Sequence, residues 1–137
     1  MKKLLYALKD ILDGTSHASV QEHSGRTSNP GASNRVSILL IDASGSMEEQ
    51  DYPPSRLGAA KKAAQNFVER LAQEDPIANI AVVSYSDQSQ MEVELTAASN
   101  QKYICQKINQ IHTRSFTNIT SALVMSLNIL GQNHANN

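Results

Sequence analysis

A short apolar run that ends in an acid constrains the fold of this chain more than any other feature. Residues 37–42 read Ser-Ile-Leu-Leu-Ile-Asp, and two serines follow at alternate positions. A continuous apolar run of this length is typical of a strand buried on both faces, as in a parallel α/β sheet. Functional residues of open α/β sheets gather where strands end at the carboxyl edge. The sequence therefore predicts an α/β fold with Asp42, Ser44 and Ser46 just beyond that edge.

These three side chains are hard oxygen ligands. A carboxylate with two hydroxyls suits Mg²⁺, which takes oxygen ligands in octahedral geometry and usually keeps some of its waters. We expect Gly45 to let the turn bend sharply, so that both hydroxyls lie on the same side as the carboxylate. A simpler interpretation stays open, in which Asp42 accepts backbone N–H groups in a turn and the serines cap the next helix.

Residues 42–47, Asp-Ala-Ser-Gly-Ser-Met, resemble the metal-ion-dependent adhesion site of von Willebrand factor type A (VWA) domains. The resemblance continues along the chain. Residues 55–61 look like the start of the first long helix of that family, and residues 80–86 look like its second strand. Residues 117–123 are similar to the later loop and helix that supply a threonine to the metal. The match covers roughly residues 35–131.

The resemblance implies a doubly wound, Rossmann-like sheet and a bound Mg²⁺ or Mn²⁺. The implied metal ligands, direct or through water, are Asp42, Ser44, Ser46 and Thr117. One coordination position stays open for a carboxylate from a protein partner. The implied partner-facing residues are Gly45, Met47 and Phe116. Phe116 stands where the family often has a glycine, which narrows the site without removing the threonine hydroxyl.

The chain divides into three parts. Residues 1–13 place Leu4, Leu5, Leu8, Ile11 and Leu12 on one face of a helix. We expect this amphipathic helix to dock on the domain or on a copy of it, with a membrane-surface or partner-binding helix as the alternative. Residues 14–34 are rich in Ser, Gly and Asn and are typical of a flexible linker. Residues 35–137 are expected to form a partial VWA domain.

The domain is expected to contain about three strands and flanking helices. Ser55 is placed to cap the first long helix, and residues 77–86 form the second buried strand. Alternating residues 91–96 predict an edge strand, with Glu92 and Glu94 on its solvated face. Thr117 or Asn118 caps a last helix, which we expect to stop at Gly131.

In the resembling family, more strands and helices follow that last helix, and one carries a further aspartate that supports the metal. We therefore expect a shortened domain in which strand 37–42 has a bare edge, which is an association hazard. A homodimer that pairs two bare edges is one way to cover them. A fragment of a longer protein, or cover from another chain, is the alternative.

Composition excludes some functions. The formal net charge is −1, which argues against a nucleic-acid binder built on a basic field. Aromatic residues make up 4% of the chain and Trp is absent, so a base-stacking platform is not expected. Cys105 is the single cysteine, so no intrachain disulfide can form. With no signal peptide or membrane span in the sequence, we expect a cytoplasmic protein without membrane contact.

The sequence supports a metal-dependent protein-binding module whose partner presents an acidic residue. The alternative is a shortened domain with a vestigial metal site that serves as an assembly piece. An enzyme is not expected, because phosphoryl transfer beside Mg²⁺ needs a cationic clamp and a base. No Lys or Arg stands in residues 42–47, and His112 and Arg114 are the nearest candidates.

Overall fold

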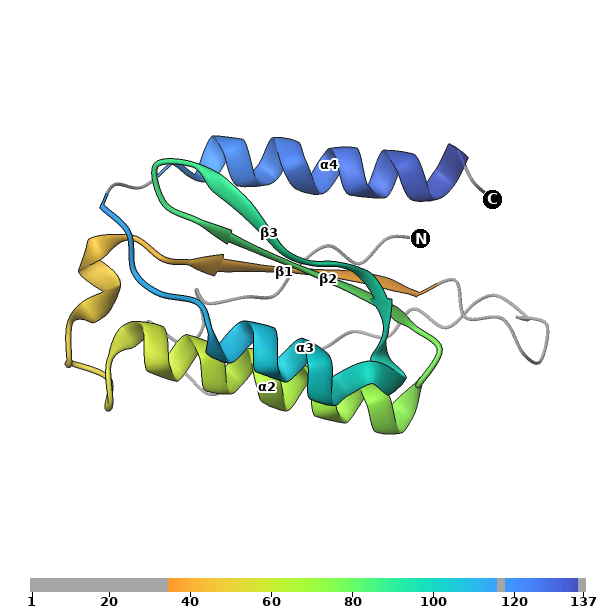
Figure 1. The fold of residues 1–137 in the computed structure, drawn as a ribbon, viewed down its shortest axis with the longest axis horizontal. Coiled ribbons are helices and arrows are strands. Elements are labelled where there is room, and N and C mark those ends of the chain that lie inside the picture. Colours follow the sequence, from red (N-terminus) through yellow and green to blue (C-terminus); the bar gives the residue numbers. More distant parts are fainter. Residues whose placement is uncertain (1–34, 116–117, 136–137) are drawn as a thin grey trace, which may run out of the picture.

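A three-stranded sheet in the order β1–β2–β3 forms the centre of the molecule. The computed structural model describes residues 35–115 and 118–135, so the expected N-terminal helix and linker lie outside the described residues. The strands are β1 (Val36–Asp42), β2 (Asn79–Tyr85) and β3 (Ser89–Ala97). Helices α2 (Arg56–Glu74) and α3 (Gln101–Asn109) cover one face, and α4 (Ile119–Ala135) covers the other (Figure 1). The short 3₁₀ helices are η1 (Gly45–Glu48) and η2 (Ala98–Asn100). The predicted α/β class is confirmed.

Strand β1 is buried on both faces, as its continuous apolar run predicts. It pairs in parallel with β2, so that Leu39 lies beside Val82 and Asp42 beside Tyr85. Alternate side chains of a strand point to opposite faces of the sheet. Leu39 therefore packs into the core under α2 and α3, and Leu40 packs into the core under α4. The parallel register also ends β1 and β2 at the same edge of the sheet.

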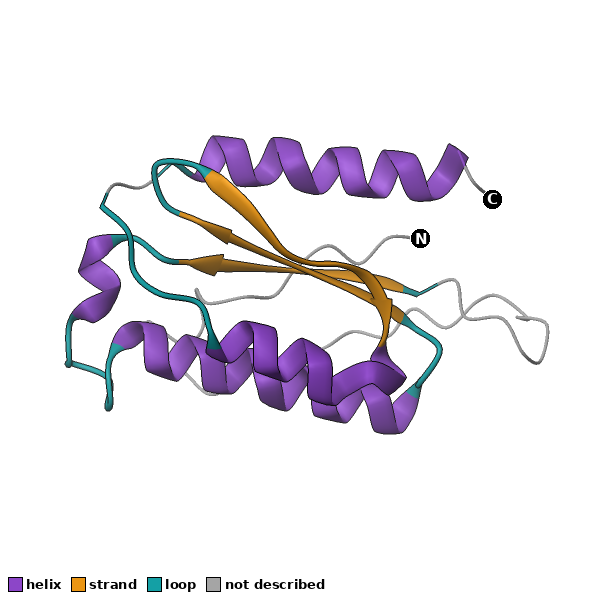
Figure 2. Cartoon of the chain, in the orientation of Figure 1, coloured by secondary structure: helices purple, strands orange, loops and turns teal. Residues whose placement is uncertain are grey.

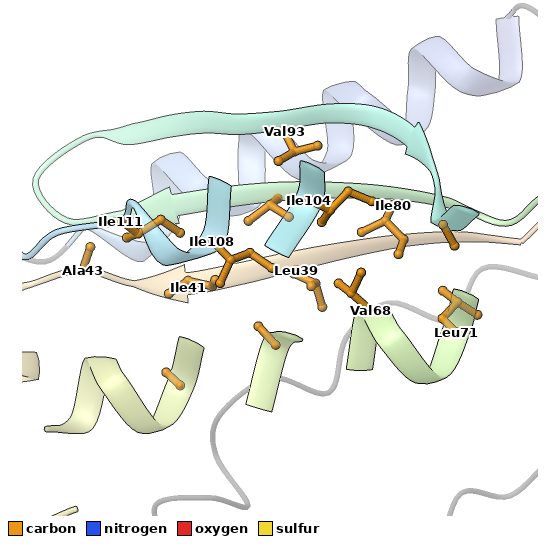
Figure 3. Packing of buried hydrophobic residues seen from close by; sticks show 14 of the residues in the cluster. Leu39, Ile41, Ala43, Val68, Leu71, Ile80, Val93, Ile104, Ile108 and Ile111 are labelled. Atoms are coloured by element: carbon orange, nitrogen blue, oxygen red, sulfur yellow. The ribbon is translucent and has the colours of Figure 1, made fainter. Parts of the chain in front are cut away.

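The larger core lies between the sheet and the pair α2 and α3. Figure 3 shows Leu39 and Ile41 of β1 facing the side chains of α2. Fully buried side chains here come from every layer, and they include Val68, Ile80, Val93, Ile104 and Ile108. The smaller core joins β1 and β2 to Ala122, Ile129 and Leu130 of α4. The two cores thus pack against opposite faces of the sheet, up to the edge where β1 and β2 end.

Helix α2 begins where the sequence predicts. The backbone N–H of Gly58 donates to Ser55 Oγ at 3.0 Å, which is the expected N-cap contact. The expected end of α4 is wrong, because the helix continues through Gly131 to Ala135. Gly131 does not adopt the left-handed backbone that ends a helix, and no proline follows it to break the ladder. None of the helices in the described ranges is long and apolar enough to cross a membrane.

The expected solvated position of Glu92 is wrong, because β3 is irregular there. Val82 pairs with Val93 while the next residue, Val83, pairs with Met91, which leaves Glu92 as an extra residue. Such a β-bulge bends the strand and re-aims a side chain. Glu92 is half-buried and accepts a hydrogen bond from Ser84 Oγ at 2.5 Å. Glu94 is exposed, as expected.

Candidate functional site

Three connecting segments meet at the carboxyl edge of β1 and β2 (Figure 2). The first is the Asp42 loop, defined here as residues 42–47, which follows β1 and contains most of η1. The second is the turn between β2 and β3. The third is the connection from α3 to α4, of which residues 110–115 and 118 are described. Because parallel strands end together at this edge, residues far apart in sequence are brought close.

The backbone of the Asp42 loop is tied to the sheet and to itself. The N–H of Ala43 donates to the carbonyl of Tyr85 at 2.7 Å, which extends the pairing of β1 by one residue. The N–H of Ser44 donates to Asp42 Oδ1 at 2.8 Å, which is the turn contact of the simpler interpretation. The N–H of Met47 then donates to the carbonyl of Ser44 at 3.0 Å and starts η1. These bonds fix the carboxylate at the strand end.

The oxygen donors of this loop form a compact group. Ser44 Oγ and Ser46 Oγ lie 3.3 Å apart. Neighbouring ligands of an octahedral Mg²⁺ site, with bonds of about 2.1 Å, lie about 3 Å apart, so this spacing fits two cis ligands. Ser44 is 2% exposed whereas Ser46 is exposed, so the pair spans the boundary between core and solvent. One oxygen of Asp42 accepts the Ser44 N–H, and the second has no hydrogen-bond partner among the described residues.

The chemistry of the donor set favours a hard cation. The described residues contain no group of three or more His, Cys, Asp or Glu side chains that could hold a metal ion. Imidazole and thiolate ligands suit zinc and other transition metals, whereas carboxylate, hydroxyl and water oxygens suit Mg²⁺ and Mn²⁺. The residues of the Asp42 loop therefore fit Mg²⁺ or Mn²⁺.

The connection from α3 to α4 is bonded to this edge of the sheet on both sides of its undescribed part. The N–H of Arg114 donates to the carbonyl of Ala43 at 2.6 Å, and Arg114 forms a β-bridge with Ser44. The N–H of Asn118 donates to the carbonyl of Ser86, just beyond β2. Thr117 and Phe116 lie outside the described residues. Their described neighbours, however, contact residues at the ends of both parallel strands.

Two expected partner-facing residues differ in their surroundings. Gly45 is exposed, and a Cβ placed on it would lie 3.4 Å from the carbonyl oxygen of Ser115. Its backbone is not left-handed and a Cβ would make only an ordinary van der Waals contact there, so the expected need for glycine at a sharp bend is not met at this position. Met47 is 5% exposed and packs into the core under α2. The expected contact of Met47 with a partner is wrong for this structure, because its side chain is buried.

A neutral phenol lies beside the carboxylate. Tyr85 is the β2 partner of Asp42 in the parallel register. Burial raises the pKa of the Tyr85 hydroxyl to about 12, and the negative charge of Asp42 contributes in the same direction. Both causes disfavour a phenolate, because burial penalises charge and a like charge repels it. Tyr85 therefore stays protonated next to Asp42 at neutral pH.

A second polar group near the site was not found from the sequence. Arg114 Nη2 donates to Ser84 Oγ at 2.7 Å, Arg114 Nη1 donates to Gln90 Oε1, and Ser84 Oγ donates to Glu92 Oε1. A pocket of about 140 Å³ opens beside these residues and is lined by Gln90, Glu92, Gln110, Ile111, His112 and Arg114. A serine at the end of the buried strand β2 was the available signal, since a buried hydroxyl needs a partner.

Comparisons with known proteins agree with this architecture. A family model described as von Willebrand factor type A domain matches residues 37–137. A UPF0353 protein of Mycolicibacterium paratuberculosis is 41% identical over 51 residues, which is 37% of this chain and 14% of that protein. The chain thus spans about a seventh of this curated relative.

Solved structures give the same family. The vWF domain of the type V pili tip protein Mfa5 from Porphyromonas gingivalis has a TM-score of 0.61 and 28% identity, over 71% of this chain and 32% of that chain. A von Willebrand factor type A structure from Catenulispora acidiphila has a TM-score of 0.59 and 26% identity, over 69% of this chain and 22% of that chain. Since the family model covers most of the sequence and the sheet has the matching architecture, the chain belongs to the von Willebrand factor type A domain family.

Proposed function

We propose that this chain is a metal-dependent protein-binding module whose partner supplies a carboxylate to a cation at the carboxyl edge of the sheet. VWA domains are generally protein-interaction modules. The observation that carries the metal-dependent part is the 3.3 Å approach of two serine hydroxyls beside a carboxylate whose second oxygen has no partner among the described residues. The proposed metal ligands, direct or through water, are Asp42, Ser44, Ser46 and Thr117.

Each residue of the Asp42 loop has a distinct part in this proposal. Asp42 supplies the negative charge, and the Ser44 N–H holds its carboxylate in place. Ser44 and Ser46 supply neutral oxygens, which leave the bound cation with positive charge for a partner carboxylate. Mg²⁺ or Mn²⁺, when bound, would offer an open coordination position to that carboxylate. Gly45 is exposed next to Ser46, and we propose that it faces the partner together with Phe116.

An enzymatic role has little support in the geometry. VWA domains are typically non-enzymatic adhesion or assembly modules. Arg114, the nearest cationic candidate, already donates to Ser84 and Gln90. His112 is exposed and lines the neighbouring pocket together with Arg114. We propose binding without catalysis, and we propose a reducing, cytoplasmic compartment because the single Cys105 is a free thiol.

The second candidate is an assembly piece with a vestigial metal site. Two observations favour it. The outer edge of β1 pairs with no strand within the described residues. Four apolar side chains of α4 are also exposed, namely Ile119, Leu123, Val124 and Leu127. An unpaired strand edge and an exposed apolar face both favour association. A second copy of the chain would cover both in a homo-oligomer.

Thermal unfolding with and without metal tests the proposal. Mg²⁺ or Mn²⁺ at a hundredfold excess over its Kd should stabilise the wild type by about 2.7 kcal/mol, because it binds only the folded chain. Asp42→Asn keeps an acceptor for the Ser44 N–H but removes the charge, and we expect it to abolish the shift. Glu94→Gln is the matched control, since Glu94 is an exposed carboxylate on β3.

The outcomes separate the two candidates. A metal-dependent shift in the wild type and in Glu94→Gln, absent in Asp42→Asn, supports the binding module. If metal does not change a cooperative melt, the metal-dependent module is rejected. If the same chain associates with increasing concentration, the assembly role remains.

A further inference from the structure

We infer that Arg114 is a positioning residue that holds the α3–α4 connection against the Asp42 loop through side-chain hydrogen bonds to both β2 and β3. Ser84 and Gln90 accept these hydrogen bonds, and Glu92 accepts one from Ser84. Together with Arg114, these three residues are called the Arg114 clamp. The inference rests on the proposed function, because it assigns the clamp an effect on metal affinity. The clamp itself is built from described side chains.

The side chain of Arg114 bonds to both strands of the hairpin. Nη2 donates to Ser84 Oγ of β2 at 2.7 Å, and Nη1 donates to Gln90 Oε1 of β3. Ser84 uses its own proton to donate to Glu92 Oε1 at 2.5 Å. The Ser84 hydroxyl therefore accepts a hydrogen bond from a guanidinium and donates one to a carboxylate. Hydrogen bonds that involve a charged group are stronger than those between neutral groups.

The backbone of the same residue bonds to the candidate site. The Arg114 N–H donates to the carbonyl of Ala43, and Arg114 forms a β-bridge with Ser44. A single residue thus connects the β2–β3 hairpin, through its side chain, to the loop that carries the proposed metal ligands, through its backbone. If the guanidinium lost its hydrogen bonds to the hairpin, we expect the backbone hydrogen bond between Arg114 and Ala43 to open more often.

The Arg114 clamp buries polar groups, and this burial costs free energy. Ser84 is fully buried, and Arg114 Nε is buried with no hydrogen-bond partner in the described part of the chain. A buried polar atom without a partner costs free energy, and apolar side chains of similar volume often fill such a space as well or better. The β-bulge that turns Glu92 toward Ser84 is a further local irregularity. What this arrangement provides, and apolar packing does not, is a defined position for Arg114.

The test uses the full chain and compares three arginine variants. Arg114→Met keeps most of the length and removes every donor, whereas Arg114→Lys keeps the charge and loses the planar fork. Arg70→Met is the matched control, because Arg70 also makes a side-chain hydrogen bond, to Glu74, but lies 75% exposed on α2. Two quantities are measured: amide hydrogen exchange in metal-free protein, and Mn²⁺ affinity by calorimetry.

Arg114→Met should speed exchange of the Arg114 amide by about tenfold or more, the scale expected for losing hydrogen bonds to a charged group. Exchange of β1 and β2 amides should stay unchanged. Mn²⁺ affinity should fall by about tenfold, with Arg114→Lys between Arg114→Met and the wild type. Arg70→Met should change neither quantity. Partial rescue by lysine and a loss of metal affinity are not expected from general destabilisation.

Other results would overturn the inference or separate it from the proposed function. Unchanged exchange at Arg114, or equal acceleration at all amides, overturns the positioning role. Faster local exchange in a chain whose wild type binds no Mn²⁺ rejects the proposed function and keeps the clamp. Mn²⁺ binding that is equal in wild type and Arg114→Met overturns the inference while the proposed function stands. Should Arg114→Met not fold, Ser84→Ala removes the hydroxyl that accepts from Arg114 and is judged by the same criteria.

Discussion

At the scale of single residues, Asp42 provides a negative charge to the candidate site. Its carboxylate lies at the end of β1, and its neighbour in the sheet is the phenol of Tyr85. Burial is the larger cause of the raised Tyr85 pKa, and the Asp42 charge is the second. The pKa of the phenol therefore responds to the nearby negative charge of Asp42, although Tyr85 is not a proposed ligand.

Alkaline titration of tyrosine absorbance should include a step from Tyr85 at a pKa of about 12, above its usual 10.0. Tyr85→Phe should remove this late step. Asp42→Asn should lower the pKa of Tyr85 but leave it above 10.0, because burial remains. An unchanged pKa in Asp42→Asn would contradict a close Asp42 charge.

The same shift has a consequence for stability. The folded-state pKa of Tyr85 lies above the unfolded value, so its contribution to the free energy of unfolding is complete below about pH 10. That contribution should decline as pH rises from 10.0 towards 12. Denaturant unfolding at several alkaline pH values should show a smaller decline for Tyr85→Phe than for the wild type.

The residues of the site differ in how far the sequence predicts them. Asp42, Ser44 and Ser46 follow an apolar run directly, so local pattern alone places them at a strand end. Gln90, Glu92 and Arg114 come together only through the hairpin register and a β-bulge. A bulge shifts a side chain from one face to the other, and period-two alternation cannot reveal it. The sequence could therefore suggest that the Ser84 hydroxyl has a partner, but not that Gln90, Glu92 and Arg114 gather around it.

At the scale of elements, each of two helices contains one glycine in a different setting. Gly58 lies in the first turn of α2, and a Cβ on it would lie 2.6 Å from Pro54 Cγ. Gly131 lies inside α4, and a Cβ on it would meet nothing within 4 Å. Alanine generally stabilises a helix relative to glycine, so the surroundings decide the sign of each substitution.

Gly131→Ala should raise the free energy of unfolding by about 0.5–1 kcal/mol, because it removes backbone freedom from the unfolded chain at no steric cost. Gly58→Ala should lower it by about 1–3 kcal/mol, because the methyl group overpacks against a proline ring. Urea unfolding of both variants measures the difference. Equal effects of the same sign would contradict the packing described for Pro54.

The N-terminus of α2 gives a separate prediction. Ser55 Oγ accepts the N–H of Gly58 at 3.0 Å, so Ser55→Ala leaves that N–H without its partner. We expect a loss of about 1 kcal/mol in the free energy of unfolding. Ser99→Ala is the control, since Ser99 is an exposed serine in η2. If both variants unfold at the same urea concentration, the cap does not stabilise α2.

Element ends show where sequence reasoning holds and where it does not. The start of α2 was predictable because serine is a specific N-cap residue, and the contact is local. The end of α4 was not, because glycine stops a helix only where the backbone becomes left-handed. Residues 132–135 continue the helix although most of them are exposed, so the local sequence around Gly131 does not reveal where α4 ends.

At the scale of the whole molecule, the two faces of the sheet are covered unequally. Two helices cover one face, whereas in the described part α4 lies alone on the other (Figure 1). Helix α4 has no Asp, Glu, Lys or Arg, and its outer side chains include Leu123 and Leu127, which are 39% and 64% exposed. Exposed apolar side chains that gather on one helix often mark a protein interaction site. Together with the unpaired edge of β1, this predicts self-association of the 137-residue chain.

Sedimentation equilibrium over a range of concentrations should therefore show a reversible oligomer for the wild type. The double variant Leu123→Lys and Leu127→Lys places two charges on the outer face of α4, and burying them in an interface is costly. We expect it to weaken association by about tenfold or more, since at least 1.4 kcal/mol should be lost. Phe67→Lys is the control, because Phe67 is 37% exposed on α2, on the opposite layer. Equal weakening by the control would place the interface elsewhere, and a wild type that stays monomeric at every concentration would reject the assembly role.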